Sequence, residues 1–410
     1  MKKHLTTLFA LLLAATGSAQ NISGSWTGLL EAGPVKLHIT FNLKTDANGK
    51  NICLMDSPDQ GAKGIPTQLL HISKDSLSIS VPNIGAAYDG KLHNNIITGK
   101  FTQMGRVIPL DLKNEILKYN RPQHPSAPYP YTTEEVTFEN SQANAILSGT
   151  LTYPKGYKKG DKVPVVLMVS GSGPQNRDSE IFEHKPFLVI ADFLARNGIA
   201  TLRYDDRAVG KSSGKHQAPT TKEVSNDAQA GLDFLRKSNS FSAVGILGHS
   251  EGATVAFMLG ALQSPDFILS LAGSGVKGDE CLYAQAKRIT ELSGHPLTMD
   301  KAQYVKFALA RPNPWLEYFM NYDPEADIKN TDCPVFALNG EKDCQVIASL
   351  NLTSIAQKLP KNINSKTKLY PGLNHLFQEC KTGLPQEYAT IEQTISPIVL
   401  KDIAEWIKSL

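Results

Sequence analysis

The stretch AVGILGHSEGATVAFMLGAL, residues 243–262, predicts a buried strand, a tight turn and a helix in immediate succession. The apolar run before Gly248 has the length of an interior strand, and the small and apolar residues after Gly252 suit a helix. Between them, GHSEG fits the pattern G-x-S-x-G, in which two glycines allow a strained turn that exposes the serine. The sequence therefore predicts that Ser250 stands at the carboxyl end of a central strand.

The same pattern occurs a second time, as GKSSG at residues 210–214. This occurrence follows RYDDRAV and precedes KHQAPTTKE, a polar run that contains Pro219 and predicts a loop. It does not complete a phosphate-binding P-loop, because that pattern needs glycine where the chain has Asp205. We therefore assign the chemistry to GHSEG and expect GKSSG to be a structural loop.

Two further candidate side chains follow later strands. The strand PVFALNG, residues 334–340, is followed by Glu341 and Asp343, and the strand TKLYPG is followed closely by His375. The order serine, acid, histidine, with each residue beyond the end of a strand, is typical of the α/β-hydrolase triad. We expect Ser250 to be the nucleophile, His375 to carry its proton and Asp343 to orient the imidazole, with Glu341 as the rival acid.

Such a site also needs an oxyanion hole of two backbone N–H groups. One is expected from Glu251, the residue after the serine, and the other from Ser172 in the loop SGSGPQNRD that follows the strand VPVVLMVS. This chemistry requires no metal and no organic cofactor.

Changes of composition divide the chain. Residues 21–118 contain short alternating runs and turn signals, including Asn48-Gly49, which is typical of a type I′ turn, and predict a small antiparallel β-barrel-like domain. The proline-rich residues 119–131 predict a stiff linker. From 132 to 410, strands alternate with helices, which predicts an α/β domain with a mostly parallel, doubly covered sheet.

A segment at residues 276–330 interrupts this alternation and predicts a helical lid insertion. Within it, WLEYFMNYDP carries aromatic residues that suit either an acyl pocket or ordinary packing of the lid. They are Trp315, Tyr318, Phe319 and Tyr322.

The N-terminus, residues 1–20, has the features of a secretory signal peptide: Lys2 and Lys3, a short apolar core and small residues before the expected cleavage site. We therefore expect an exported protein, periplasmic or secreted, with no membrane span in the mature chain. Loss of the two lysines lowers the formal net charge of +3 by two. A nearly neutral chain without basic runs does not indicate a nucleic-acid partner.

The cysteines number five and their spacing matches no zinc pattern. In an oxidising compartment, a disulfide between Cys344 and Cys380 is one hypothesis, and free buried thiols are the other.

The second domain resembles a bacterial α/β-hydrolase family of secreted or cell-associated carboxylesterases. The matching stretches are GSGPQNRD (171–178), LRYDDRAVGKSSG (202–214), GHSEG (248–252), LNGEKDCQV (338–346) and LNHLFQ (373–378). The resemblance implies an α/β-hydrolase fold with Ser250, Asp343 and His375 as the triad. In that family the stretch around GKSSG is a loop beside the site, and Ala208 stands where the family has glycine. The first domain is similar to the small barrel-like domain that precedes some of these esterases.

We therefore expect a serine hydrolase that cleaves short-chain carboxylic esters of small molecules through an acyl-enzyme intermediate. Two alternatives remain. One is a serine peptidase of the prolyl-oligopeptidase type, which has the same triad order but normally carries a much larger domain in front. The other is a protein that binds an apolar ligand and has an inactive hydrolase domain. Neither the oligomeric state nor the natural ester follows from the sequence.

Overall fold

The computed structural model describes residues 22–33, 35–215, 219–361 and 364–410, so that the expected signal peptide lies outside the described residues. The chain divides into two compact units, one ending at Lys118 and the other covering Tyr119–Leu410. Within the described residues, no helix has both the length and the apolar character needed to cross a membrane.

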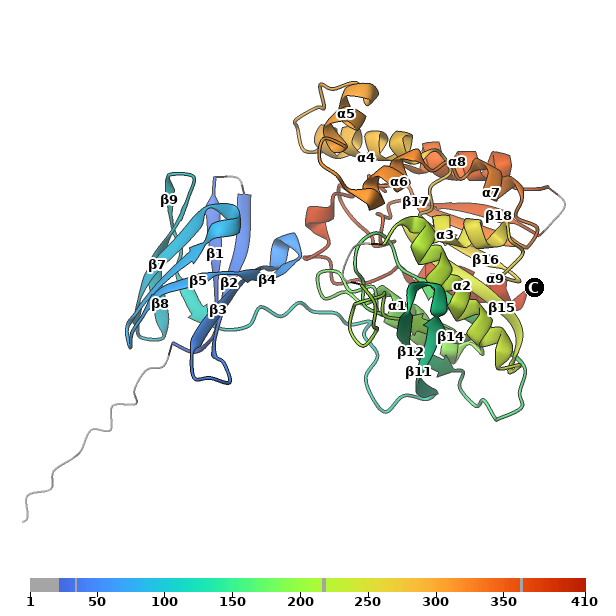
Figure 1. The fold of residues 1–410 in the computed structure, drawn as a ribbon, viewed down its shortest axis with the longest axis horizontal. Coiled ribbons are helices and arrows are strands. Elements are labelled where there is room, and N and C mark those ends of the chain that lie inside the picture. Colours follow the sequence, from blue (N-terminus) through green and yellow to red (C-terminus); the bar gives the residue numbers. More distant parts are fainter. Residues whose placement is uncertain (1–21, 34, 216–218, 362–363) are drawn as a thin grey trace, which may run out of the picture. The chain divides into compact units, whose positions relative to one another are not determined.

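The first unit is an antiparallel sheet that curls into a nearly closed, barrel-like body (Figure 1), which confirms the predicted class. Its elements are β1 (Gly24–Ala32), β2 (Val35–Thr45), β3 (Asn51–Ser57), β4 (Ala62–Pro66), β5 (Gln68–Ile72), β6 (Ser76–Val81), β7 (Ala86–His93), β8 (Ile96–Gln103), β9 (Arg106–Pro109) and β10 (Leu112–Asn114), with 3₁₀ turns at Pro58–Gln60 and Pro82–Ile84. The strand order is β4-β3-β2-β1-β10-β8-β7-β6-β5, with β9 paired to β8. Since only Thr67 separates β4 from β5, the two ends of the sheet are neighbours in the chain.

Alternation along the strands fills the interior of this unit. In β6, Leu77, Ile79 and Val81 are buried while the serines between them are half-buried. The largest interior side chain, Trp26, has a partner for its polar atom. Its indole N–H donates to the Ile22 carbonyl at 2.7 Å.

The predicted type I′ turn at Asn48-Gly49 is wrong. Asp46 to Lys50 form a five-residue connection between β2 and β3, closed by hydrogen bonds from Gly49 N to Asp46 O and from Asp46 N to Lys50 O. Only Gly49 of the predicted pair has a positive φ, at 78°. A type I′ turn needs positive φ at both positions, and the longer loop removes that need.

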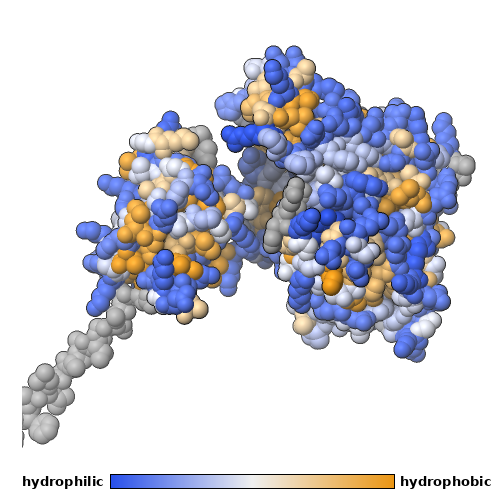
Figure 2. Space-filling model, in the orientation of Figure 1, coloured by the Kyte–Doolittle hydropathy of each residue, from blue (hydrophilic) through white to orange (hydrophobic). Residues whose placement is uncertain are grey.

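Several hydrophobic side chains of the first unit are exposed, and Figure 2 shows hydrophobic residues gathered on its visible face. They include Leu70, Met104, Val107 and Ile116.

The second unit has the α/β-hydrolase fold, as predicted. Its sheet follows the order β11-β12-β14-β13-β15-β16-β17-β18; all pairs from β14 to β18 are parallel, whereas β11 and β12 run antiparallel to their neighbours. The strands are β11 (Thr132–Asn140), β12 (Ala145–Tyr153), β13 (Val163–Val169), β14 (Ala200–Tyr204), β15 (Phe241–His249), β16 (Ile268–Leu271), β17 (Val335–Gly340) and β18 (Lys366–Tyr370).

Helices cover both faces of this sheet. They are α1 (Pro186–Arg196), α2 (Thr221–Lys237), α3 (Glu251–Gly260), α8 (Ala348–Lys358) and α9 (Pro397–Lys408), with 3₁₀ turns at Ser141–Ala143 and Pro385–Glu387. Strand β13 is apolar on both faces, which is why helices pack on both faces of the sheet. Val165 and Leu167 belong to the core under α2, α3 and α8, and Val166 and Met168 belong to the core under α1 and α9. A strand buried on both faces is continuously apolar, which is the pattern that predicted it.

The segment predicted as a helical insertion lies between β16 and β17 and forms four further helices. They are α4 (Gly278–Leu292), α5 (Lys301–Ala308), α6 (Pro314–Asn321) and α7 (Glu325–Lys329). We call α4–α6 the lid.

Candidate active site

Ser250 sits in a strained turn between β15 and α3. Its backbone has φ 56° and ψ −119°, a left-handed conformation that costs a residue with a side chain about 1–3 kcal/mol. The turn is fixed by hydrogen bonds from Ser250 N to Leu271 O at 2.9 Å and from Ala253 N to Ser250 O at 3.0 Å. The strand–turn–helix predicted for GHSEG is therefore confirmed.

The two glycines of GHSEG are required by close backbone contacts. A Cβ on Gly248 would lie 2.0 Å from Gly252 O, and a Cβ on Gly252 would lie 2.2 Å from Val169 O. Gly171 lies on the other side of the turn, where a Cβ would be 3.2 Å from the Cβ of Ser250. The turn thus packs against the end of β13 through main-chain atoms.

His375 and Asp343 come together at the same edge of the sheet. The Nδ1 of His375 lies 2.8 Å from Oδ2 of Asp343, and both side chains are almost fully buried. Asp343 is held in place because its Oδ1 accepts hydrogen bonds from the backbone N–H groups of Gln345 at 2.8 Å and Val346 at 2.9 Å.

The rival acid lies elsewhere. Glu341 is exposed, and its carboxylate accepts a hydrogen bond from Gly372 N at 2.9 Å. The structure brings Asp343, and not Glu341, to His375.

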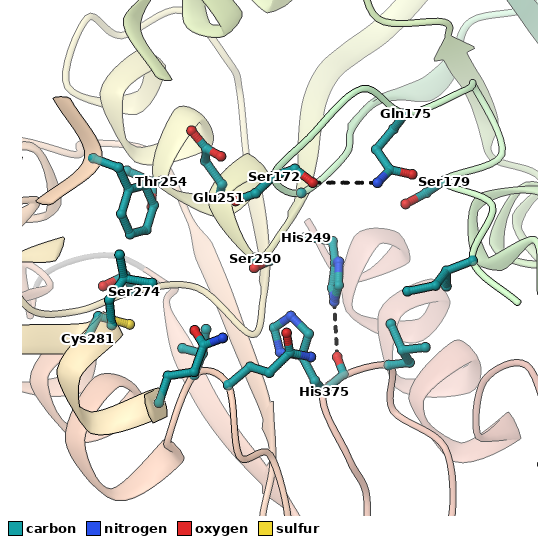
Figure 3. A pocket seen from close by; sticks show the side chains of 18 of the residues that line it. Ser172, Gln175, Ser179, His249, Ser250, Glu251, Thr254, Ser274, Cys281 and His375 are labelled. Carbon is teal, nitrogen blue, oxygen red and sulfur yellow. Dashed lines mark hydrogen bonds between the residues drawn. The ribbon is translucent and has the colours of Figure 1, made fainter. Parts of the chain in front are cut away.

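Ser250 and His375 line one pocket of about 240 Å³, which we call the site pocket. Figure 3 shows Ser250 at its centre, with His375 on one side and Ser172 and Glu251 on the other. Ser172 and Glu251 line it too, and in the described part of the chain neither of their backbone N–H groups donates a hydrogen bond to another protein group. Two N–H groups left free beside a serine suit an oxyanion.

GKSSG is a loop, as predicted, and it serves to hold other chain segments. The hydroxyl of Ser212 accepts from Ser148 N at 2.9 Å and donates to Asp205 O at 2.7 Å, and Ser213 N donates to Ile146 O. Ser212 is buried in these contacts and does not line the site pocket.

Two acids that follow β14 anchor the loop that carries Ser172. Asp205 accepts from the backbone N–H of Arg177 at 2.9 Å and from its guanidinium at 2.8 Å. Asp206 accepts from Gln175 N at 2.8 Å, and its own N–H donates to Gln175 O at 3.0 Å. Burial raises the pKa of Asp206 to about 7, against the opposing effect of these hydrogen bonds. We did not predict this role; the available signal was a pair of acids directly after a buried strand.

His249, the residue before Ser250, is a second contributor that sequence reasoning missed. Its Nε2 donates to the His375 carbonyl at 3.0 Å, and the two imidazole rings lie 4.7 Å apart. Burial, followed by the nearby charge of His375, lowers the pKa of His249 to about 4. His249 is therefore neutral at neutral pH and adds no positive charge beside His375.

The lid aromatic residues divide into two groups. Trp315 and Phe319 line the site pocket. Tyr318 and Tyr322 do not; they stack on each other at 6.0 Å, and the Tyr322 hydroxyl donates to Asp327.

All five cysteines are free thiols in this structure, so that the disulfide hypothesis is wrong here. The thiol of Cys344 donates to Gly383 O at 3.1 Å and that of Cys380 to Gly372 O at 3.4 Å. Each thiol thus has a separate carbonyl partner.

Parts of this chain are similar in sequence to known proteins. Residues 184–298, which include Ser250, match the sequence family described as serine aminopeptidase, S33. Esterase EstD of Thermotoga maritima is 27% identical over 273 residues, which cover 64% of this chain and 65% of that protein. The chain therefore spans slightly less than two thirds of the length of this curated relative.

Solved structures similar to this chain include two esterases. Est1E from Butyrivibrio proteoclasticus, solved with ferulic acid, is 17% identical, with 67% of this chain and 98% of that chain covered and a TM-score of 0.48. The esterase Pf2001 of Pyrococcus furiosus is 16% identical, with 68% and 93% covered and a TM-score of 0.46.

The backbone of Ala208 provides a test of the loop geometry. Ala208 has φ 60°, in the left-handed region that favours glycine, and its N–H donates to Ser213 O at 3.1 Å. We expect Ala208→Gly to raise the free energy of unfolding by ~0.5–1 kcal/mol, because the strain relieved exceeds the entropy that glycine adds to the unfolded chain. Urea unfolding measures the change.

The matched control is Ala356→Gly, at an exposed position within helix α8, which we expect to lower the free energy of unfolding by ~1 kcal/mol. A loss of stability in Ala208→Gly similar to that in the control would contradict the strained geometry.

The buried imidazole of His249 predicts a pH dependence of stability. Its folded pKa of about 4 lies below the ordinary value of 6.5, so that between these pH values the unfolded chain binds a proton that the folded chain does not. The free energy of unfolding therefore falls as pH drops from 6.5 to 4. In His249→Gln, the difference between urea unfolding at pH 6.5 and at pH 4.5 should be smaller than in the parent, and an undiminished difference would refute the assignment.

Proposed function

We propose that the second unit is a serine hydrolase that cleaves short-chain carboxylic esters through an acyl-enzyme intermediate. The observation that carries the proposal is the 2.8 Å contact between His375 and the buried Asp343, on the rim of the pocket into which the strained turn presents Ser250. Ser250 and His375 line one pocket and Asp343 contacts His375, which supports their assignment as nucleophile, base and orienting acid.

In this proposal each of the three residues has one role. The hydroxyl of Ser250 attacks the ester carbonyl while His375 takes its proton at Nε2. Asp343 accepts a hydrogen bond from the Nδ1–H of His375, which fixes the tautomer and stabilises the imidazolium. His375 then donates the proton to the leaving alcohol, and the same sequence with water as the attacking group releases the acid.

The groups around Ser250 stabilise the charges that develop in these steps. The carbonyl oxygen becomes negative in the tetrahedral intermediate, beside the N–H groups of Ser172 and Glu251 and the N-terminus of α3. Losing one such donor typically costs ~3 kcal/mol of barrier. The neutral state of His249 leaves the positive charge of the intermediate on His375 alone.

An ester, and a small one, suits the pocket and the comparisons. A volume of about 240 Å³ lies below the range of ~300–1,000 Å³ that drug-sized ligands occupy. The relative EstD is named an esterase. A peptidase remains the alternative, because the matching family description names serine aminopeptidases. Turnover of p-nitrophenyl acetate beside aminoacyl-nitroanilides separates the two, and fast anilide cleavage without ester selectivity would favour the peptidase.

The nucleophile is tested by replacing each pentad serine. We expect Ser250→Ala to lower kcat for p-nitrophenyl acetate by up to ~10⁶-fold and to abolish mass addition by a fluorophosphonate probe. Ser212→Ala, the matched control, should lose stability through its two hydrogen bonds but still be labelled once. Labelling of the Ser250→Ala protein at full stoichiometry would place the nucleophile elsewhere, and unchanged ester hydrolysis would leave a binding protein as the better function.

The orienting acid is tested by a second matched pair. We expect Asp343→Asn to lower kcat by ~10⁴-fold, because an amide that donates to Nδ1 selects the wrong tautomer of His375. Glu341→Gln removes a carboxylate of the same loop that does not touch His375, and kcat should change less than threefold. A reversal of these two effects in steady-state kinetics would assign the acid to Glu341.

A further inference from the structure

Glu251 buries its side chain against two other helices. Its carboxylate accepts a hydrogen bond from the hydroxyl of Thr221 at 2.5 Å, and the indole N–H of Trp315 lies 3.0 Å from each of its oxygens. Thr221 begins α2 and Glu251 begins α3, so that the partial positive charges of two helix N-termini favour a carboxylate there. The Glu251 side chain thus joins the lid helix α6 to the turn that carries Ser250.

A second cavity, of about 610 Å³, lies beside the site pocket, and we call it the side cavity. Much of its lining is hydrocarbon, contributed by Pro174, Ala208, Val209 and Val224. Its acid Asp206 is engaged by the Gln175 N–H. The side cavity therefore suits an apolar group.

The wall between the two cavities is made of few residues. Those that line both are Gly171, Ser172, Glu251 and Trp315. Gly171 and Ser172 belong to the loop expected to bind the oxyanion, so that this part of the wall cannot move without loss of that site. The remaining part consists of the Glu251 side chain and the Trp315 indole that it holds in place.

The chemistry of ester cleavage says which part of a substrate faces this wall. The leaving oxygen must reach His375, which lines the site pocket and does not line the side cavity. The acyl chain leaves the carbonyl carbon in another direction. The side cavity borders the oxyanion residues but not His375, so that the acyl part of the substrate, and not the leaving group, is the part that can face it.

We propose that Trp315, positioned by Glu251, limits the length of the acyl group, and that the side cavity behind it is an unused extension of the acyl site. The inference rests on the proposed function and deepens it: the substrates are esters with short acyl groups, because the indole closes the route to the apolar cavity. Removal of the indole joins the two cavities and lets longer acyl chains bury their methylenes there.

The test is a chain-length series on the full-length protein. We expect Trp315→Ala to raise the ratio of kcat/KM for p-nitrophenyl octanoate to that for the acetate at least tenfold over the parent ratio, since each newly buried methylene contributes about fourfold. Trp315→Phe keeps a ring but cannot donate to Glu251, and its ratio should lie between those of the parent and the alanine variant. If the alanine variant folds poorly, the ratio measured with Trp315→Phe decides the test.

The matched control is Tyr318→Ala, an aromatic residue of the same helix that lines neither cavity. Its octanoate-to-acetate ratio should equal that of the parent. An increase in this control as large as that in the Trp315 variants would mean that general loosening of the lid, and not the wall, sets chain length.

A second series separates failure of this inference from failure of the proposed function. Methyl and octyl p-nitrophenyl phosphonates react with an activated serine to form a P–O bond and release p-nitrophenolate, whether the natural substrate is an ester or an amide. If the parent is labelled at Ser250 but the octyl-to-methyl rate ratios of Trp315→Ala and Trp315→Phe both equal that of the parent, the role of Trp315 is refuted. The proposal of a serine hydrolase is then still supported. If the parent is not labelled at Ser250, the proposed function and the inference both fall.

Discussion

The candidate site depends on direct contact between main-chain atoms at the start of α3. Gly252 packs on the Val169 carbonyl at the end of β13, and Gly248 packs on Gly252 itself, with no space for a side chain at either position. The chain can pass between these contacts only if Ser250 adopts its left-handed backbone. This backbone conformation places the hydroxyl beyond the end of β15, at the edge where neighbouring parallel strands also end. His375 and Asp343 lie at the same edge because they follow two of those strands.

Carboxylates around Ser250 are held mainly by N–H and O–H donors. Asp343 accepts from two backbone N–H groups as well as from His375. Asp206 accepts from the loop of Ser172, and Glu251 accepts from two side chains at helix starts. Through these hydrogen bonds the acids give the loops and the lid defined positions around the serine. Asp205 links the loop of GKSSG to the loop of Ser172, because it accepts from Lys211 N as well as from Arg177 N.

Local sequence pattern was sufficient for the central sheet and for the candidate triad. Continuous apolar runs identified the buried strands, and Asp343 and His375 were found because each follows such a run. The antiparallel pair β11 and β12 was not predicted. The sequence of β11, TTEEVTFEN, is mostly polar, and the strand is mostly exposed at the edge of the sheet. The partners of Glu251 were also missed. Thr221 and Trp315 lie 30 and 64 residues from it, and no local period connects residues so far apart.

The assignment of the nucleophile and the oxyanion donors is tested most directly by a crystal structure of the protein after reaction with methyl p-nitrophenyl phosphonate. We expect phosphorus bonded to Oγ of Ser250, one of its two unesterified oxygens ~2.7–3.1 Å from the backbone N atoms of both Ser172 and Glu251, and the His375 imidazole on the side of the departed group. An adduct on another residue, or one in which both unesterified oxygens point away from the two N–H groups, would contradict the assignment.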